Sequence, residues 1–186
     1  AGDGLLNLAF EIMADALSNA EDEAALRRQL NAMKYIANSA GADGMILGQA
    51  IDLKSENIAI SAENINYMHD KITGALIKAA ILAPAFIVGA ASSTTRLLEV
   101  YASSFGLAFQ IKDDILDVEG DAAILGKSTG KDAESGKNTF VAAYGLEQSR
   151  RMLEEETTKA ICAAKELGEN AGFFIWLTRL MSTRSR

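Results

Sequence analysis

The sequence predicts an all-α protein with a single domain over residues 1–186. Hydrophobic residues make up 49% of the chain, and alanine and leucine, which both favour helices, are abundant. Pro84 is the single proline, so long helices can run without interruption. The length allows one substantial core, and nothing in the chain argues for a second domain.

Charge and cysteine content narrow the range of partners and compartments. The formal net charge is −7, from 18 basic and 25 acidic side chains, and no basic stripe with interleaved aromatics occurs, so no nucleic-acid partner is expected. The most apolar run, residues 79–91, is shorter than the roughly 20 residues that span a bilayer, so no stable membrane insertion is expected. Cys162 is the only cysteine, which favours a reducing compartment, the cytoplasm.

Two amphipathic helices are expected at the start of the chain. From Leu5 to Leu17 the apolar residues recur at the spacing of a helix with one buried stripe. This stripe consists of Leu5, Leu8, Ala9, Ile12, Met13, Ala16 and Leu17. The second helix is expected over residues 23–39, with Gly41 placed to stop it. Its inward side chains are expected to be Leu26, Leu30, Met33, Ile36 and Ala37. Both helices are interpreted as scaffold.

The segment from Gly44 to Leu53 combines glycines and polar residues in a helical pattern. A glycine costs roughly 1 kcal/mol against alanine inside a helix, so Gly44 and Gly48 suggest close helix packing or a ligand pressed against the backbone. Gln49 and Asp52 lie three residues apart on one face, and polar groups on an apolar helix need partners.

A polar loop over residues 54–60 precedes a helix that Ser61 can cap. This helix carries the string Met68-His69-Asp70-Lys71-Ile72-Thr73-Gly74-Ala75-Leu76-Ile77. A lone histidine is more often structural than catalytic, and His69 is interpreted in that way.

Three more helices are expected in the second half of the chain. Residues 92–95 can cap the first of them, which leads to a cluster of aspartates. A long amphipathic helix should run from Leu146 to Leu167, where Gly168 ends it, and the last helix should cover residues 171–181.

The aspartate cluster is the most informative feature of the sequence. Asp113 and Asp117 stand one helical turn apart on one face, and Asp114 lies on the flank of that face, so the three carboxylates can converge. Carboxylates packed this closely repel one another unless a cation compensates. Hard oxygen ligands of this kind suit Mg²⁺, which holds one or two carboxylates, several waters and the oxygens of a substrate phosphate. We therefore expect Mg²⁺ at Asp113, Asp114 and Asp117.

A glycine- and lysine-rich segment follows the aspartates. Lysine supplies a flexible point charge that can follow a phosphate, and glycine lets the backbone bend close to it. The residues concerned are Gly126, Lys127, Gly130, Lys131, Gly136 and Lys137. Together with the aspartates, they indicate a magnesium diphosphate site. The alternative is an all-α scaffold with an acidic, solvated patch.

The string Phe109-Gln110-Ile-Lys-Asp113-Asp114-Ile-Leu-Asp117 resembles the second aspartate-rich motif of the trans-isoprenyl diphosphate synthases. The likeness to the bacterial farnesyl (geranyltrans-) type continues through Leu125-Gly-Lys127, Gly130-Lys-Asp132, Gly136-Lys-Asn-Thr139-Phe and Gly145-Leu-Glu147. The Gly48 segment resembles the family's Gly-Gln-x-x-Asp motif, whose glutamine borders the substrate cavity. The resemblance implies a bundle of long antiparallel helices around a central cavity.

The resemblance also implies an activity and its residues. A family member transfers the prenyl group of an allylic diphosphate, dimethylallyl or geranyl, to isopentenyl diphosphate with the help of Mg²⁺, giving a short-chain product of farnesyl type. Catalytic roles would fall to Asp113, Asp114, Lys127 and Thr73, and substrate-binding roles to Gln49, Thr73, Gln110, Lys127, Asp132 and Lys137. The family also implies a homodimer.

Two departures from the family pattern qualify this expectation. In the motif His-x-x-Lys-Thr-Gly-x-Leu, Ile72 stands where the lysine belongs, and Lys71 is one residue early, which turns it about 100° around a helix. Either the helix is locally rearranged, or the site has lost one cation, or a working enzyme differs here. In addition, the first aspartate-rich motif and its arginine pair are not in this sequence, so the N-terminal helices of the bundle are expected to be missing from it. A non-catalytic relative that binds diphosphate or a partner subunit is the alternative.

Overall fold

The computed structural model describes residues 1–125 and 138–185, and every regular element in these ranges is helical. The first three helices are α1 (Gly2–Ser18), α2 (Glu23–Ala40) and α3 (Met45–Lys54). They are followed by α4 (Ala62–His69), a π-helical turn (Asp70–Gly74) and α5 (Ala75–Ile87). The second half contains α6 (Ser92–Leu125), α8 (Phe140–Tyr144), α9 (Leu146–Lys165), a 3₁₀ turn (Gly168–Asn170) and α10 (Ala171–Thr183). The predicted all-α class is confirmed.

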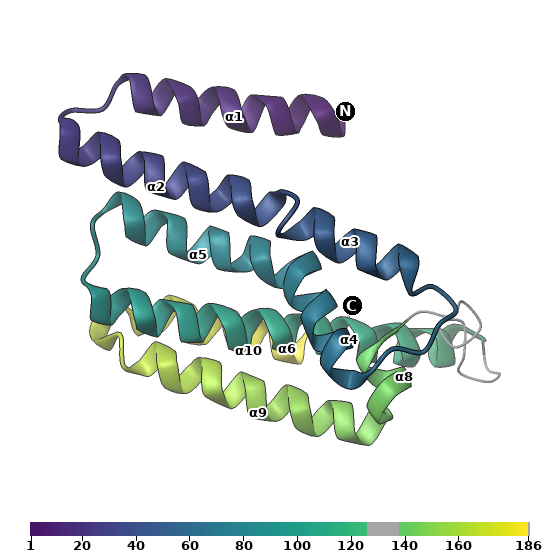
Figure 1. Ribbon diagram of the computed structural model, residues 1–186. Coiled ribbons are helices and arrows are strands. Elements are labelled where there is room, and N and C mark those ends of the chain that lie inside the picture. The colour runs from purple at the N-terminus through teal and green to yellow at the C-terminus, as the bar shows by residue number, and fades with distance from the viewer. Residues whose placement is uncertain (126–137, 186) are drawn as a thin grey trace.

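The helices are stacked side by side (Figure 1). In this view α1 forms one edge, α2 and α3 come next, α5 follows, and α9 lies at the opposite edge beyond α6 and α10. None of the helices in the described ranges is both long and apolar enough to cross a bilayer.

The helix ends follow the signals in the sequence. Asp22 accepts a hydrogen bond from the backbone N of Ala25 at 2.6 Å, and Ser61 accepts one from the N of Asn64 at 3.3 Å, so both cap the helices that follow them. Gly168 adopts a φ of +73°, which L side chains rarely reach, and α9 ends just before it. The predicted stops and starts at Ser61 and Gly168 are confirmed.

The main core lies where α6, α9 and α10 meet. Small residues on α9 (Ala160, Ala163 and Ala164) let the aromatic residues of α6 pack closely against it. Tyr101 of α6 is fully buried, and its hydroxyl donates to the backbone O of Phe174 at 3.2 Å in α10. A second cluster joins α4, α6 and α8 through Ile65, Ile111, Ile115 and Phe140. The second cluster therefore packs the aspartate-bearing half of α6 against α4 and α8.

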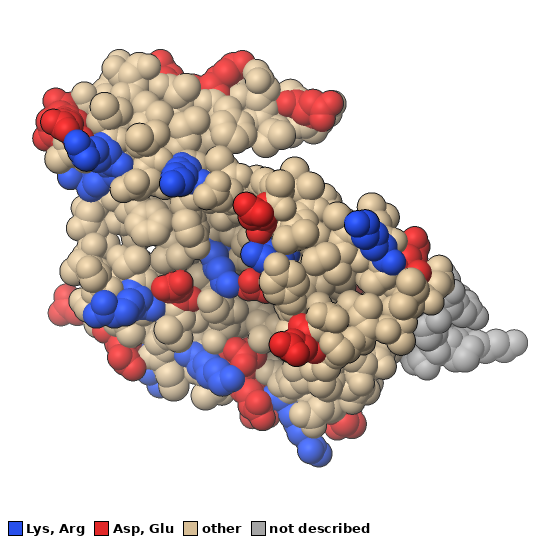
Figure 2. Space-filling model, viewed as in Figure 1, with Lys and Arg blue, Asp and Glu red and all other residues tan. Residues whose placement is uncertain are grey.

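The predicted burial of the first helix is wrong. α1 forms over the expected residues but contains no buried residue, and Leu5 and Ile12 are 68% and 62% exposed. In α2, Leu26 and Leu30 are also exposed, whereas Met33, Ile36 and Ala37 are half-buried. The physical reason is the position of α1 at the edge of the stack, where it packs mainly against α2 and projects beyond the body of the molecule (Figure 2).

Candidate active site

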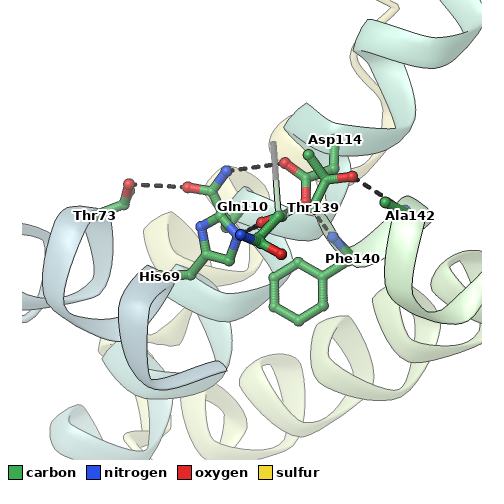
Figure 3. Close-up of polar contacts among 8 residues, drawn as sticks. His69, Thr73, Gln110, Asp114, Thr139, Phe140 and Ala142 are labelled. Atoms are coloured by element: carbon green, nitrogen blue, oxygen red, sulfur yellow. Dashed lines mark hydrogen bonds and ion pairs between the residues drawn. The ribbon is translucent and has the colours of Figure 1, made fainter. Parts of the chain in front are cut away.

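A chain of hydrogen bonds joins the π-helical turn to the aspartates of α6 (Figure 3). The hydroxyl of Thr73 donates to Gln110 Oε1 at 2.9 Å, and Gln110 Nε2 donates to Asp114 Oδ1 at 3.1 Å. The other oxygen, Asp114 Oδ2, accepts from the backbone N of Phe140 at 2.7 Å, at the start of α8. This chain connects two motifs that lie 37 residues apart in the sequence.

Asp114 is buried, unlike the other two aspartates of the motif. Its side chain is 6% exposed, whereas that of Asp113 is 38% exposed and Asp117 lies on the surface. Burial raises the pKa of the Asp114 carboxyl to about 6. The hydrogen bonds from Phe140 and Gln110 act in the opposite direction, and the charges of Asp117 and Asp113 raise the pKa further. Asp114 is therefore ionised only above about pH 6.

His69 supports the same arrangement from α4. Its Nε2 lies 3.3 Å from the backbone O of Asn138 and 4.0 Å from Asp114 Oδ2, and its ring stacks on Phe140 with a centroid separation of 5.0 Å. Burial lowers the pKa of His69, so the ring is neutral at pH 7. These contacts support the interpretation of His69 as a structural residue.

Asn138 fixes the loop between α3 and α4. Its Nδ2 donates to the backbone O of Ser55 at 2.9 Å and of Ile58 at 3.1 Å, and its Oδ1 accepts from the N of Ile60 at 3.3 Å. Thr139, the next residue, caps α8 by accepting from the N of Ala142 at 3.1 Å. Sequence reasoning assigned no role to Asn138, although an Asn-Thr pair before a short helix signals a cap.

We expect the buried carboxyl to give the stability of the chain a characteristic pH dependence. The pKa of Asp114 is about 6 in the folded chain, above its ordinary value of 3.8, so the folded carboxyl binds its proton more tightly and favours folding as the pH falls. Between pH 6.5 and 4, wild type should gain on the order of 2 to 3 kcal/mol in unfolding free energy relative to Asp114→Asn. Urea unfolding at several pH values measures this difference.

The Asn variant is a matched control, because it has the same shape and cannot titrate. The lowered pKa of His69 has the opposite effect, a loss of stability below about pH 6.5, in both proteins. Because His69 Nε2 lies 4.0 Å from Asp114 Oδ2, the comparison is repeated in a His69→Gln background, where this histidine no longer titrates. A difference between the two proteins that stays constant from pH 6.5 to 4 would contradict the prediction.

The carboxylate of Asp113 is paired with an arginine of the same chain. It forms an ion pair with the Nη2 of Arg184, near the end of the chain. The guanidinium also lies over the ring of Phe109, with its Cζ 4.4 Å from the ring centroid. Arg184 therefore neutralises the carboxylate that leads the aspartate motif.

The aspartates fit a magnesium ion only in part. Within the described ranges, no three His, Cys, Asp or Glu side chains are grouped so that they alone could hold a metal. Both oxygens of Asp114 already accept hydrogen bonds. Asp113 and Asp117 lie four residues apart on the outer face of α6, and both their charges act on Asp114. Two carboxylates suit Mg²⁺ when waters and phosphate oxygens complete its coordination.

The lysine that is one residue early does not point toward the aspartates. The π-helical turn confirms a local rearrangement of the helix between Asp70 and Gly74. Lys71 Nζ donates to the backbone O of Asp43 at 2.9 Å and lies 5.4 Å from the ring centroid of Tyr67. Ile72 instead packs into a notch at Gly48 of α3, where an added Cβ would come 2.5 Å from the N of Ile72. Close helix packing therefore accounts for Gly48.

The other predicted site residues do not take part in the hydrogen-bonded chain of Thr73, Gln110 and Asp114. Gln49 is exposed on α3, and Asp52 of the same helix is half-buried, where its charge raises the pKa of His69 against the effect of burial. Lys127, Lys131, Asp132 and Lys137 lie outside the described residues. A cavity of about 230 Å³ lies beside Gln110, His69 and Gly74. This volume is below the roughly 300–1,000 Å³ of typical ligand pockets.

Known proteins resemble this chain over nearly all of its length. The family model for polyprenyl synthetase matches residues 1–170. The farnesyl diphosphate synthase of Escherichia coli (strain K12) is 40% identical over 172 residues, which cover 92% of this chain and 56% of that protein. The farnesyl diphosphate synthase of Micrococcus luteus is 35% identical over 167 residues, covering 90% and 55%.

The solved structures that resemble this chain include enzymes with names of the same kind. A geranyltransferase from Helicobacter pylori, complexed with magnesium and isoprenyl diphosphate, has a TM-score of 0.74 and 30% identity, with 97% of this chain and 57% of that one covered. An FPP/GFPP synthase from Zymomonas mobilis has a TM-score of 0.80 and 31% identity, with 97% and 59% covered. The chain thus spans a little over half the length of these relatives, and it belongs to the polyprenyl synthetase family.

Proposed function

We propose that this chain forms the part of a prenyltransferase that binds the allylic diphosphate. The whole protein would condense dimethylallyl or geranyl diphosphate with isopentenyl diphosphate to give a short-chain product of farnesyl type. The observation that carries this proposal is the Thr73–Gln110 hydrogen bond of 2.9 Å, because it joins the π-helical turn to the aspartate-bearing helix in one site. The names of the relatives, farnesyl diphosphate synthase and geranyltransferase, support the reaction class.

Each site residue would have its own role in binding the metal or the substrates. Asp113 and Asp117 would hold Mg²⁺, with Asp114 buried behind them. When bound, the ion would draw charge from the diphosphate and so favour its departure. Thr73 and Gln110 would lie beside the allylic group. Lys127 and Lys137 are proposed to contact the diphosphates, and Gln49 and Asp132 are proposed to belong to the substrate-binding site.

In the proposed reaction, the bond between the allylic carbon and the diphosphate oxygen breaks, and the diphosphate leaves with the electron pair. The double bond of isopentenyl diphosphate attacks the allylic cation, and one proton is then lost to the departing diphosphate, which restores a double bond. Apolar side chains around the site would exclude water from the cation.

A homodimer and a cytoplasmic location are also part of the proposal. The exposed apolar side chains of α1 support a dimer, because large apolar patches on a surface mark interaction sites. They are Leu5, Leu6, Leu8 and Ile12. The cytoplasmic location rests on the single cysteine of the sequence.

Incorporation of labelled isopentenyl diphosphate tests the proposed reaction. With geranyl diphosphate and Mg²⁺ we expect the whole protein that contains this chain to form a labelled product that is extractable into an organic solvent after removal of the diphosphate. A whole protein that binds both substrates without forming product would contradict the proposed catalysis.

The second candidate function is diphosphate binding without turnover. The contact of Lys71 with the backbone of Asp43 favours it, because the cation of this motif is turned away from the aspartates. The double swap Lys71→Ile with Ile72→Lys restores the family order without changing composition or charge. If the swap gives product where the wild type gives none, the wild type is a binding relative. If both form product at similar rates, the position of the lysine is not decisive and the first function stands.

Removal of the internal cation should strengthen metal binding. Arg184 forms an ion pair with Asp113, and the two side chains are 25% and 38% exposed, respectively. Partly exposed ion pairs of this kind stabilise a protein by up to about 1 kcal/mol. We therefore expect Arg184→Ala to raise the affinity for Mn²⁺, a hard ion with similar ligand preferences, by up to about 5-fold. The concentration of free Mn²⁺, measured by electron paramagnetic resonance, gives this affinity.

The matched control is Arg179→Ala, which removes an exposed arginine of α10. This variant should bind Mn²⁺ as the wild type does. Equal or weaker binding in Arg184→Ala would contradict the prediction.

A further inference from the structure

The cavity of about 230 Å³ beside Gln110 lies between α4, the π-helical turn, α6 and α9, and we call it the side cavity. Of the described residues proposed for the diphosphate site, Gln110 alone also lines it, whereas Thr73, Asp113 and Asp117 do not. The side cavity is therefore a separate space next to that site. Its polar lining includes Asn66, His69, Asp70, Ser103, Ser104 and Glu156.

The ring of His69, which is only 8% exposed, has one nitrogen without a partner. Its Nε2 faces the backbone O of Asn138, an acceptor, so Nε2 carries the hydrogen and the neutral ring has a lone pair at Nδ1. Nδ1 is turned toward the π-helical turn (Figure 3), and no described residue forms a hydrogen bond with it. Gln110 also acts on His69, but its oxygen accepts from Thr73 and its NH₂ group donates to Asp114. Nδ1 is thus an unused acceptor in the lining of the side cavity.

Further unused acceptors line the same cavity. The buried Oδ1 of Asn66 has no hydrogen-bond partner among the described residues. Asp70 accepts through Oδ1 from Lys78 at 2.5 Å. Glu156 accepts through Oε1 from Lys159 at 2.6 Å. Neither lysine lines the cavity, so its lining contains two carboxylates and two unpaired acceptors but no lysine or arginine.

This lining favours a ligand that brings positive charge and N–H donors. A buried acceptor without a donor lowers stability, and carboxylates in a confined space favour a cation. A metal ion does not meet the need, because no three His, Cys, Asp or Glu side chains in the described ranges are grouped to hold one. The acceptors belong to three different elements, so the ligand must reach from one to another. Since a water takes about 30 Å³ in the liquid, the side cavity has room for about six to eight non-hydrogen atoms.

We propose that the side cavity binds a small organic dication of the diamine class. Its two ammonium groups would pair with Asp70 and Glu156, and Asn66 Oδ1 and His69 Nδ1 would accept their remaining N–H groups. Asp70 begins the π-helical turn, so the bound cation would also hold this turn in place. The site goes beyond the proposed prenyl transfer and does not depend on it.

Calorimetric titration with 1,4-diaminobutane, whose size suits the side cavity, tests the proposal in the whole protein that contains this chain. At about pH 7.5, where the His69 ring is neutral, we expect saturable binding with a Kd of about 1 mM or below. The uncharged analogue 1,4-butanediol should bind at least about 10-fold more weakly. Diamine binding that does not saturate, or that the diol matches, would overturn the proposal.

Two adjacent glutamates of α9 provide a matched comparison. Glu156→Gln removes a charge from the lining and should weaken diamine binding by at least about 5-fold. Glu155→Gln removes the same charge from an exposed position and should leave binding unchanged. Asp113→Ala should also bind the diamine as the wild type does. Equal binding in the two glutamate variants, or loss of binding in Asp113→Ala, would overturn the proposal, the latter because the cation would then lie at the aspartates of α6.

Nuclear magnetic resonance locates the bound cation. His69 is the only histidine of this sequence, and in protein labelled with ¹⁵N-histidine its ring signals are those that His69→Gln lacks. The diamine should shift the Nδ1 signal with the same midpoint as the calorimetric titration, and it should shift the Nε2 signal less, because Nε2 faces Asn138. An Nδ1 signal that does not move at saturation would overturn the proposal.

Discussion

Replacing Asp113 with alanine should weaken the Mg²⁺-dependent binding of geranyl diphosphate by roughly 100-fold, a loss of about 2.7 kcal/mol. Asp113 is half-exposed, charged and already paired with a cation, so it is the carboxylate best placed to hold a metal ion. A bound ion and diphosphate would cover Asp113, and losses of 2 to 5 kcal/mol are typical when one partner of a close, desolvated charge pair is removed. Calorimetric titration with saturating Mg²⁺ measures the change.

Two further variants make this prediction specific. Glu154→Ala removes an exposed carboxylate of α9 and should leave binding unchanged. Arg184→Ala, which removes the internal cation, should not weaken binding of the metal. Binding of geranyl diphosphate by Asp113→Ala within about 3-fold of the wild type would show that Asp113 holds no metal at this site.

The second large effect concerns the fold of the site. Phe140→Ala should lower the free energy of unfolding by about 3 to 5 kcal/mol, the usual cost of removing a fully buried aromatic side chain. Phe140 is 0% exposed and packs in the cluster with Ile65, Ile111 and Ile115. Its ring also stacks on His69. Urea unfolding followed by circular dichroism measures the loss.

An exposed aromatic residue provides the control for this change. Phe173 of α10 is 61% exposed, so Phe173→Ala should change stability by no more than about 0.5 kcal/mol. A loss below about 1 kcal/mol in Phe140→Ala would contradict the packing of α8 against α4 and α6.

Much of the fold could be predicted from the sequence because its signals are local. Caps such as Ser61 and stops such as Gly168 act within one turn of the chain, and both are where the sequence predicts them. Burial depends on which elements come together in space. The apolar stripe of α1 has the spacing of a buried face, yet among the described helices α1 packs mainly against α2.

In the candidate site, too, the local features could be predicted from the sequence and the long-range contacts could not. The spacing of Asp113 and Asp117 follows from helix geometry, and so does their common face. Nothing in the spacing indicates that Asp114 turns inward to the N of Phe140, because that contact spans 26 residues. A local rearrangement of the helix is one of three alternatives that the sequence leaves open for the displaced lysine; the π-helical turn at residues 70–74 shows such a rearrangement, yet Lys71 still pairs with the backbone of Asp43. The lysines at positions 127 and 137 stay predictions.

The most direct test is a calorimetric titration of the chain with geranyl diphosphate, with Mg²⁺ and with a chelator in its place. If the aspartates of α6 and the π-helical turn form one diphosphate site, heat of binding should appear only with Mg²⁺ and should vanish in Asp113→Ala. Binding that persists in the chelator, or no binding with Mg²⁺ present, would contradict a magnesium diphosphate site and would favour a helical scaffold with an acidic patch.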